Sequence, residues 1–467
     1  MAWLSPLDLV SSARTNSSLH LPAIDALYTD TEFVWLPKSP KSPKILHMLR
    51  TLLDRPELAK YIQTIKITHE ECKRKGRGTS WAFDHSRPKL VHTCPVQSAE
   101  LDSIKLRNAL ITSARVPTEN INNWMTSILK GNADSIMALI VALSPNIKEI
   151  VFASFEASGK WQFLAKMFQQ TLSASLQNNA QRFERLRHVL IEPNLHGNKE
   201  NFTRDGNSVL SLFYLPNLQT LSISVPNSDG FSWPMSTAPS SLKLTSLKLH
   251  RSFRYKWLYH PVFDIPLNFY EVDLDEIVAA IVAAPCRKTL VDLRIDATRE
   301  KRRDWATWMD TRQFPIIIKG SLSALKLLPN IKSLWLPFAF VAGMGFGAFT
   351  QLTPGSISTI LPRQIENLVL ADDFPISVDY LWEQKDILSA FEAELDNTDF
   401  VAQFKKLKSV TLPHCTAPLV APESAASRKT LERLREKCDF RVSTLYNPME
   451  YHDIHVKYFI RGVFCEW

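Results

Sequence analysis

Histidine and cysteine side chains gather in one stretch of the sequence. His69 and Cys72 are three residues apart, His92 and Cys94 are two apart, and His85 lies between the two pairs. Zinc prefers four nitrogen or sulfur ligands in a tetrahedron. However, this spacing is not that of a common zinc finger, and the intervening residues are polar and rich in glycine and arginine, which favours a solvated loop. We therefore expect no metal site and no cofactor.

No catalytic motif accompanies these residues. The sequence lacks the GxSxG and HExxH patterns of hydrolases and the GxGxxG and GxxxxGK[ST] patterns of phosphate-binding loops. The glycine-rich stretch Phe338 to Phe349 carries no charge, so we predict an apolar loop on one rim, with a partner surface as the alternative. Asp273, Asp275 and Glu276 are predicted to begin a helix, whose positive end favours carboxylates. We expect a protein that is not an enzyme.

Three short segments concentrate positive charge. Lys73 to Arg77 and Arg299 to Arg303 could bind an anion, but a solvated loop is the more common role of such runs. Lys38 to Lys44 alternates lysine with Ser-Pro and is predicted as a linker, in which phosphorylation of Ser39 or Ser42 is a hypothesis. The net charge of +8, from 55 basic and 47 acidic residues, is mild for this length, so no nucleic acid is expected as a partner.

The composition is that of an ordinary globular protein. Of 467 residues, 45% are hydrophobic and 22% are charged. The six cysteines form no CxxC pair, and Met1 to Val10 lacks the features of a signal peptide, so we expect free thiols and a cytoplasmic or nuclear location. The longest apolar stretches, such as Ile277 to Ala284, are far shorter than the roughly 20 residues of a membrane span.

A repeated phrase organises the chain: an aliphatic residue, two variable residues, a second aliphatic residue, one variable residue and a third aliphatic residue. The second and third aliphatic residues are two apart, so in a strand both face the same side. The first residues of successive phrases are 26 to 46 residues apart from position 147 onward, which is irregular. The phrases are Ile62-Ile65-Ile67, Ile147-Ile150-Phe152, Leu186-Val189-Ile191, Leu218-Leu221-Ile223, Leu244-Leu247-Leu249, Leu290-Leu293-Ile295, Ile331-Leu334-Leu336, Ile365-Leu368-Leu370 and Leu407-Val410-Leu412, with Leu101-Ile104-Leu106 as a weaker member.

Such short strands need neighbours, and parallel neighbours need crossover connections, usually helices. Several segments between the phrases show helical periodicity. The repeat array is predicted to close with a helix and an edge strand, ahead of the C-terminal tail. A stacked α/β solenoid is therefore predicted, with an ordinary α/β domain as the alternative. The predicted helices are Asn122 to Leu143, Trp161 to Leu176, Val272 to Ala284, Tyr380 to Leu395 and Leu431 to Cys438, and the edge strand is Phe440 to Val442.

The N-terminal segment is predicted to cap the first repeat. Residues 4 to 21 have a helical pattern that Ser5-Pro6 can begin, with Leu7, Val10 and Leu19 on one apolar side. A terminal repeat needs such a cover because its apolar edge would otherwise face water.

The same segment, LSPLDLVSSARTNSSLHLPAIDALYTDTEF, resembles the second half of the F-box in the large fungal family of F-box proteins with divergent leucine-rich repeats. Residues 45 to 67, ILHMLRTLLDRPELAKYIQTIKI, are similar to that family's linker helix and first repeat strand. The resemblance implies a substrate-recognition subunit of a Skp–cullin–F-box ubiquitin ligase. Its partners would be the Skp adaptor and an unknown substrate protein. The residues implied in adaptor binding are Leu4, Leu7, Leu9, Val10 and Leu19.

The resemblance departs from the family at one point. The opening Leu-Pro helix, which makes much of the family's adaptor contact, has no counterpart before Leu4. The alternative function is therefore a repeat scaffold without a ligase link.

The expected fold is α/β: a right-handed leucine-rich-repeat-like solenoid, shaped as an irregular horseshoe, with a short helical F-box-like remnant. The expected domains are the F-box-like segment (1–35), a linker and first helix (36–60), the solenoid (61–442) and a C-terminal capping tail (443–467).

Overall fold

The computed structural model places parallel strands and intervening helices along most of the chain. It describes residues 5–35, 44–69, 101–155, 162–178, 183–193, 210–225, 239, 243–252, 255–260, 265–298, 316–342, 356–371, 384–413 and 425–445. The chain divides into two compact units, which are described separately below. Unit 1 comprises residues 1–224 and 228–244, and unit 2 comprises residues 225–227 and 245–467.

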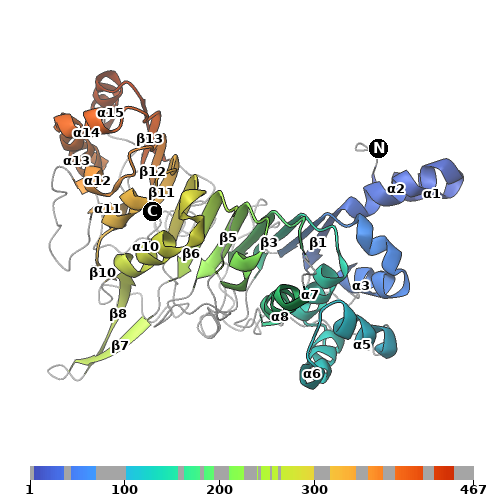
Figure 1. The fold of residues 1–467 in the computed structure, drawn as a ribbon. Coiled ribbons are helices and arrows are strands. Elements are labelled where there is room, and N and C mark those ends of the chain that lie inside the picture. The colour runs from blue at the N-terminus through green and yellow to red at the C-terminus, as the bar shows by residue number, and fades with distance from the viewer. Residues whose placement is uncertain are drawn as a thin grey trace, which may run out of the picture. The chain divides into compact units, whose positions relative to one another are not determined.

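Unit 1 contains parallel strands in the spatial order of the sequence, from β1 to β5. On one side of these strands lie α3, α7 and α8, with α5 and α6 packed farther out (Figure 1). The strands are β1 (Asp30–Trp35), β2 (Thr64–His69), β3 (Glu149–Phe155), β4 (His188–Pro193) and β5 (Thr220–Val225).

The connections of unit 1 are helical wherever the structure describes them. Two helices precede β1, and the segments between strands form α-helices or 3₁₀ turns. They are α1 (Pro6–Thr15), α2 (Ser17–Thr29), α3 (Lys44–Asp54), η1 (Pro56–Tyr61), α5 (Ser103–Thr112), α6 (Thr118–Leu129), α7 (Ala133–Leu143), α8 (Gln162–Asn178) and η4 (Leu210–Tyr214).

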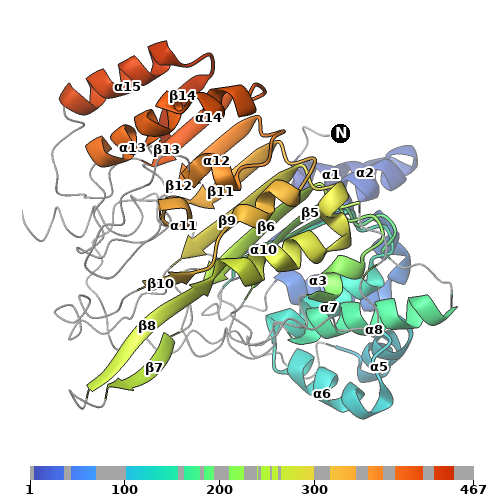
Figure 2. The ribbon, with the colours of Figure 1, turned by 60° about the vertical axis from the view of Figure 1, so that its left-hand side comes forward.

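Unit 2 contains a second run of parallel strands, in the order β6, β9, β11, β12, β13 and β14. A separate three-stranded sheet pairs β8 with β10 in parallel and with β7 antiparallel. Figure 2 shows β7 and β8 extending beyond the ends of the parallel strands. The strands are β6 (Ser246–Ser252), β7 (Tyr255–His260), β8 (Ile265–Asp273), β9 (Asp292–Thr298), β10 (Ile316–Lys319), β11 (Ser333–Pro337), β12 (Asn367–Ala371), β13 (Ser409–Pro413) and β14 (Arg441–Leu445).

Helices again form the crossovers of unit 2. In Figure 2, α10, α12 and α13 lie along one side of its parallel strands. The elements are α10 (Leu274–Ala283), η5 (Pro285–Lys288), η7 (Ser323–Leu327), α11 (Phe338–Ala342), α12 (Ser356–Ile360), α13 (Gln384–Asp396), α14 (Thr398–Gln403) and α15 (Ala425–Lys437). None of the described helices is both long and apolar enough to cross a membrane.

The predicted α/β class and the main strand phrases are confirmed. Each of the nine stronger phrases leads into one parallel strand, from β2 to β6, β9 and β11 to β13. The first and second aliphatic residues of every phrase are buried against the helices. The third is buried as well, except for the half-buried Ile191 and Leu249.

The N-terminal prediction of a single helix over residues 4–21 is wrong. The segment forms two helices, α1 and α2, that break at Asn16, whose backbone is extended (φ −143°, ψ 122°). The Asn16 side chain accepts a hydrogen bond from the Ser18 backbone N–H at 2.8 Å, which begins the second helix. The predicted start at Ser5 is confirmed, since Ser5 and Asp8 form a reciprocal capping box.

Three further predictions are corrected. The pattern Asn122 to Leu143 forms two helices separated by Gly131, which has φ +70°. The weaker phrase at 101–106 lies at the start of helix α5 and forms no strand. The predicted loop Phe338 to Phe349 begins as α11, in which Phe338 and Phe340 are buried, and residues 343–349 lie outside the described part of the chain.

Seven of the described turns that connect parallel strands repeat one backbone arrangement. The carbonyl of the residue after the first aliphatic position accepts two successive N–H groups from the next turn. In unit 1, the Gln63 carbonyl accepts from Lys148 at 2.7 Å and from Glu149 at 3.1 Å. In unit 2, the Lys332 carbonyl accepts from Glu366 at 2.7 Å and from Asn367 at 2.8 Å. The same position accepts in this way at Lys148, Arg187, Thr245, Val291 and Glu366.

Asparagine side chains add a second link between turns. At three turns, the residue directly before the first aliphatic position is an asparagine that follows a proline. The side-chain amide of this asparagine donates a hydrogen bond to a backbone carbonyl in the preceding turn. That carbonyl belongs to the residue two positions before the first aliphatic residue of the preceding phrase. The bonds run from Asn146 to Lys60 (2.6 Å), from Asn217 to Glu184 (2.8 Å) and from Asn330 to Lys288 (2.6 Å).

Carboxylate side chains on the crossover helices accept hydrogen bonds from backbone N–H groups at the start of a neighbouring helix. Asp134 on α7 accepts from the N–H groups of Phe163 (2.9 Å) and Leu164 (3.2 Å), at the start of α8. Glu394 on α13 accepts from the Ile357 N–H of α12 at 3.1 Å. Asp275 on α10 accepts from Ser321 (3.0 Å), just before η7. These bonds satisfy N–H groups that a helix leaves without partners at its beginning.

We expect the substitution Asn330→Ala to lower the free energy of unfolding by about 1 kcal/mol, because the Lys288 carbonyl loses its side-chain donor. A urea titration followed by circular dichroism measures the shift in midpoint. Asn108→Ala, at an exposed position of α5, makes the same chemical change. It is expected to leave the free energy of unfolding within about 0.5 kcal/mol of the wild-type value. Equal shifts for both variants would contradict the role of the asparagine.

We expect Asp134→Ala to be more damaging, by about 2 kcal/mol, because Asp134 is buried and two backbone N–H groups lose their acceptor. Asp134→Asn retains one acceptor oxygen and should cost roughly half as much. Hydrogen exchange of the first turn of α8 would report the loss locally. An unchanged exchange rate in the alanine variant would show that Asp134 does not hold this helix.

Candidate protein-binding surface

The face of the unit-2 strands opposite the core is polar. Side chains alternate along a strand, so the residues between the aliphatic positions project from this face, which we call the strand face. The pairing register aligns them into rows across the strands. The first row is Ser246, Asp292, Ser333, Asn367, Ser409 and Arg441, the second is Lys248, Arg294, Trp335, Val369, Thr411 and Ser443, and the third begins with His250 and Asp296.

Asp296 is the centre of the most connected part of the strand face. Its Oδ1 accepts from Nε of Arg294 at 2.6 Å, and its Oδ2 lies 3.1 Å from Nδ1 of His250. Nζ of Lys248 lies 3.6 Å from the same Oδ2, at ion-pair distance. The Arg294 guanidinium also stacks on the ring of Trp335, with its carbon 3.8 Å from the ring centroid. We call these five residues the Asp296 cluster.

The carboxylate of Asp296 is held in its charged form. Burial by itself raises the pKa of Asp296 and is the largest single effect. The hydrogen bond from His250 and the charge and hydrogen bond of Arg294 act in the opposite direction, and together they lower the pKa below its ordinary value of 3.8. The cluster therefore carries a buried anion at neutral pH, next to the cations Arg294 and Lys248.

This arrangement suits recognition of a protein partner. Arginine and tryptophan are the residue types that most often dominate binding energy at protein interfaces. The Arg294 side chain is 26% exposed and is held between a carboxylate and an aromatic ring, so it loses little freedom when it binds. The Trp335 side chain is half-buried, and its buried Nε1 donor has no hydrogen-bond partner among the described residues.

Short polar side chains extend the strand face to either side of the cluster. Ser246 donates to Asp292 at 2.8 Å, and Ser409 donates to Asn367 at 2.8 Å. The hydroxyls of Thr411 and Ser443 lie 3.1 Å apart on the neighbouring pair of strands. Each bond joins two strands, so the side chains are fixed before any partner arrives.

The five residues implied in adaptor binding have different environments. Leu7 is 79% exposed and Leu19 is 37% exposed, whereas Leu9 is buried and Val10 is half-buried. Leu4 lies outside the described residues. The helix pair α1–α2 therefore buries Leu9 and presents other leucines to solvent. Leu21, which the resemblance did not indicate, is also exposed, at 62%.

Most other candidates from the sequence lie outside the described part of the chain. They are Cys72, His85, His92, Cys94, Ser39, Ser42, the basic runs 73–77 and 299–303, and the tail 446–467. His69 is the last residue of β2, and its side chain is not described. Among the described residues, no group of three or more potential ligands could hold a metal ion.

The prediction for Asp273 is confirmed, since its side chain accepts from the Glu276 N–H at 3.0 Å and begins α10. The Asp296 cluster was not predicted. Its signal in the sequence is the set of variable positions inside the phrases, where Lys248, Arg294 and Trp335 occupy the same place in three phrases. Comparing those positions between phrases would have revealed the row.

We expect Asp296→Asn to lower the free energy of unfolding by about 2 kcal/mol at pH 7, because Arg294 and His250 lose a charged acceptor. The folded-state pKa of Asp296 is depressed, so its stabilisation is present above the unfolded value of 3.8 and is lost as pH falls through the folded value. Urea titrations at pH 7 and near pH 3 should show the difference between wild type and variant shrinking at low pH. A pH-independent difference would contradict this role of the carboxylate.

The sequence matches no protein-family model, and no curated protein matches it significantly. The strand face, the N-terminal helix pair and the sequence resemblance are therefore the features that bear on function.

Proposed function

We propose that this chain is a protein-binding repeat protein, a right-handed leucine-rich-repeat-like solenoid that serves as the substrate-recognition subunit of a Skp–cullin–F-box ubiquitin ligase in the cytoplasm or nucleus. The repeated strand phrase and the turns that recur with it support the solenoid. The observation that carries the binding role is the Arg294–Trp335 stack on the polar strand face. Ubiquitin transfer would belong to other subunits, so the proposal needs no catalytic residue in this chain.

The helix pair α1–α2 supports the link to an adaptor. It presents Leu7, Leu19 and Leu21 to solvent at the segment that resembles an F-box. Exposed apolar side chains grouped in one segment favour a protein contact. In this proposal the helix pair contacts the Skp adaptor, and the strand face holds the substrate.

The adaptor contact is tested by co-expression of the full chain with the Skp adaptor and cullin, followed by size-exclusion chromatography. We expect the three proteins to elute together. The double variant Leu7→Asp/Leu21→Asp should weaken adaptor binding by at least about tenfold, because two apolar contacts would be replaced by charges.

Ile104→Asp is the matched control, since Ile104 is 70% exposed on α5, outside the helix pair. It should leave adaptor binding unchanged. Arg294→Ala should also leave adaptor binding unchanged while reducing the recovery of substrate proteins. If wild-type protein elutes apart from the adaptor but still captures partners through Arg294, the chain is a repeat scaffold without a ligase link.

A further inference from the structure

At the edge of unit 2 where its parallel strands begin, four adjacent turns are strongly basic. Four turns lead into β9, β11, β12 and β13, at residues 287–291, 328–332, 362–366 and 404–408, all of them described. These turns contain seven basic residues and one acidic residue, Glu366, and all seven basic residues are exposed. We call the seven the basic rim; they are Arg287, Lys288, Lys332, Arg363, Lys405, Lys406 and Lys408.

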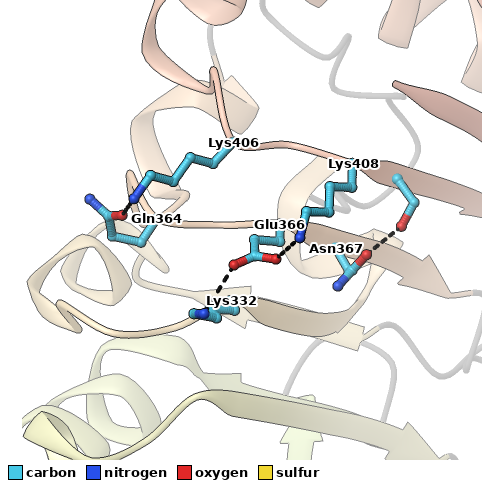
Figure 3. A network of polar contacts seen from close by, with 7 residues as sticks. Lys332, Gln364, Glu366, Asn367, Lys406 and Lys408 are labelled. Atoms are coloured by element: carbon cyan, nitrogen blue, oxygen red, sulfur yellow. Dashed lines mark hydrogen bonds and ion pairs between the residues drawn. The ribbon is translucent and has the colours of Figure 1, made fainter. Parts of the chain in front are cut away.

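The acidic residue holds two of the lysines in place (Figure 3). Oε1 of Glu366 lies 3.2 Å from Nζ of Lys332, and Oε2 pairs with Nζ of Lys408. The Glu366 side chain is 17% exposed, whereas those of Lys332 and Lys408 are 57% and 69% exposed. Glu366 therefore neutralises at most one of these two charges while both lysines face solvent.

The remaining cations have little compensation. Lys406 donates to the neutral amide oxygen of Gln364 at 2.6 Å, which fixes its position without cancelling its charge. Arg287, Lys288, Arg363 and Lys405 form no ion pair with any described residue. The rim therefore carries a net excess of six positive charges over four adjacent turns.

The spacing places these charges within mutual range. Neighbouring strands lie about 4.8 Å apart, so charges on adjacent and alternate turns are roughly 5 to 10 Å apart. This distance is close to the Debye length of about 8 Å at physiological ionic strength, so the charges repel one another. An anionic partner that lies across the turns would relieve the repulsion and gain several ion pairs together.

The chemistry favours a polypeptide over a nucleic acid. Single-stranded nucleic acid is held by exposed aromatic platforms between basic residues. The four turns contain only one aromatic residue, Phe404, and it is buried. Five of the seven cations are lysines, which act as point charges without the bidentate geometry that arginine offers to phosphate.

We propose that the basic rim of unit 2 binds an acidic segment, rich in aspartate and glutamate, of the protein held on the strand face. The rim directly precedes that face along each strand, since Lys332 is followed by Ser333 and Trp335 of the face. The inference deepens the proposed function and rests on its protein-binding part. It does not depend on the adaptor.

The test measures fluorescence anisotropy of a labelled twelve-residue peptide rich in Asp and Glu, titrated with full-length protein at 150 mM salt. The rim variant Arg363→Gln/Lys405→Gln/Lys406→Gln removes three charges but leaves the Glu366 pairs intact. We expect binding at least tenfold weaker than that of wild type. The control variant Arg107→Gln/Lys130→Gln/Lys429→Gln removes three exposed charges elsewhere and should change affinity less than twofold.

Three outcomes would overturn the proposal. They are the absence of peptide binding, an equal loss in the rim and control variants, and tighter rim-dependent binding of a single-stranded oligonucleotide of the same length. The first would show that the rim does not bind an acidic peptide, the second would leave net charge alone as the cause of the attraction, and the third would make the rim a nucleic-acid site. Co-elution of both variants with the adaptor, measured in parallel, keeps failure of the rim distinct from failure of the ligase assignment.

Discussion

The structure depends on one backbone interaction that recurs at the start of seven parallel strands. A single carbonyl accepts two consecutive N–H groups from the next turn, as the Lys332 carbonyl does from Glu366 and Asn367. This bond fixes where one strand begins relative to its neighbour. Because side chains alternate along a strand, a shift of one residue would exchange core and surface positions throughout the unit. The aliphatic core, the strand face and the basic rim are therefore all set by this register.

The connections between strands differ in length, but side-chain hydrogen bonds to backbone groups tie neighbouring connections together. In their described parts, crossovers range from the 3₁₀ turn η4 to the three helices between β2 and β3. Bonds from Asp134, Asp275 and Glu394 tie neighbouring helical turns together at different points. Asparagines at three turns tie the strand starts. Irregular spacing in the sequence is thus compatible with regular strand pairing, since the links act at the turns and leave the rest of each crossover free to vary.

Charge is distributed unevenly over unit 2 in a way that separates two roles. At the Asp296 cluster, buried Asp296 accepts from Arg294 and His250, and these bonds make a rigid group whose side chains are largely buried. At the rim, Glu366 is outnumbered, and the lysines that it holds remain exposed. A rigid, largely buried cluster favours shape-specific contact, whereas a row of exposed cations favours attraction of an acidic chain. Both features include β9 and β11 and so can act on one partner.

The sequence by itself determined the nine strands that follow the phrases, because the aliphatic spacing of each phrase is a local property that places two side chains on one face. It did not indicate β1, β7, β8 or β10. The sequence also carried the signals for the helix breaks at Asn16 and Gly131, because asparagine and glycine favour the ends of helices and turns. A continuous helical pattern on either side of each residue obscured these signals. Leu7 and Leu9 look alike in the sequence, and only packing against α2 exposes the first and buries the second. The Asp296 cluster and the basic rim were decided by the tertiary structure. Their residues are tens of positions apart, and only the register of parallel strands, set after crossovers of unequal length, brings them together.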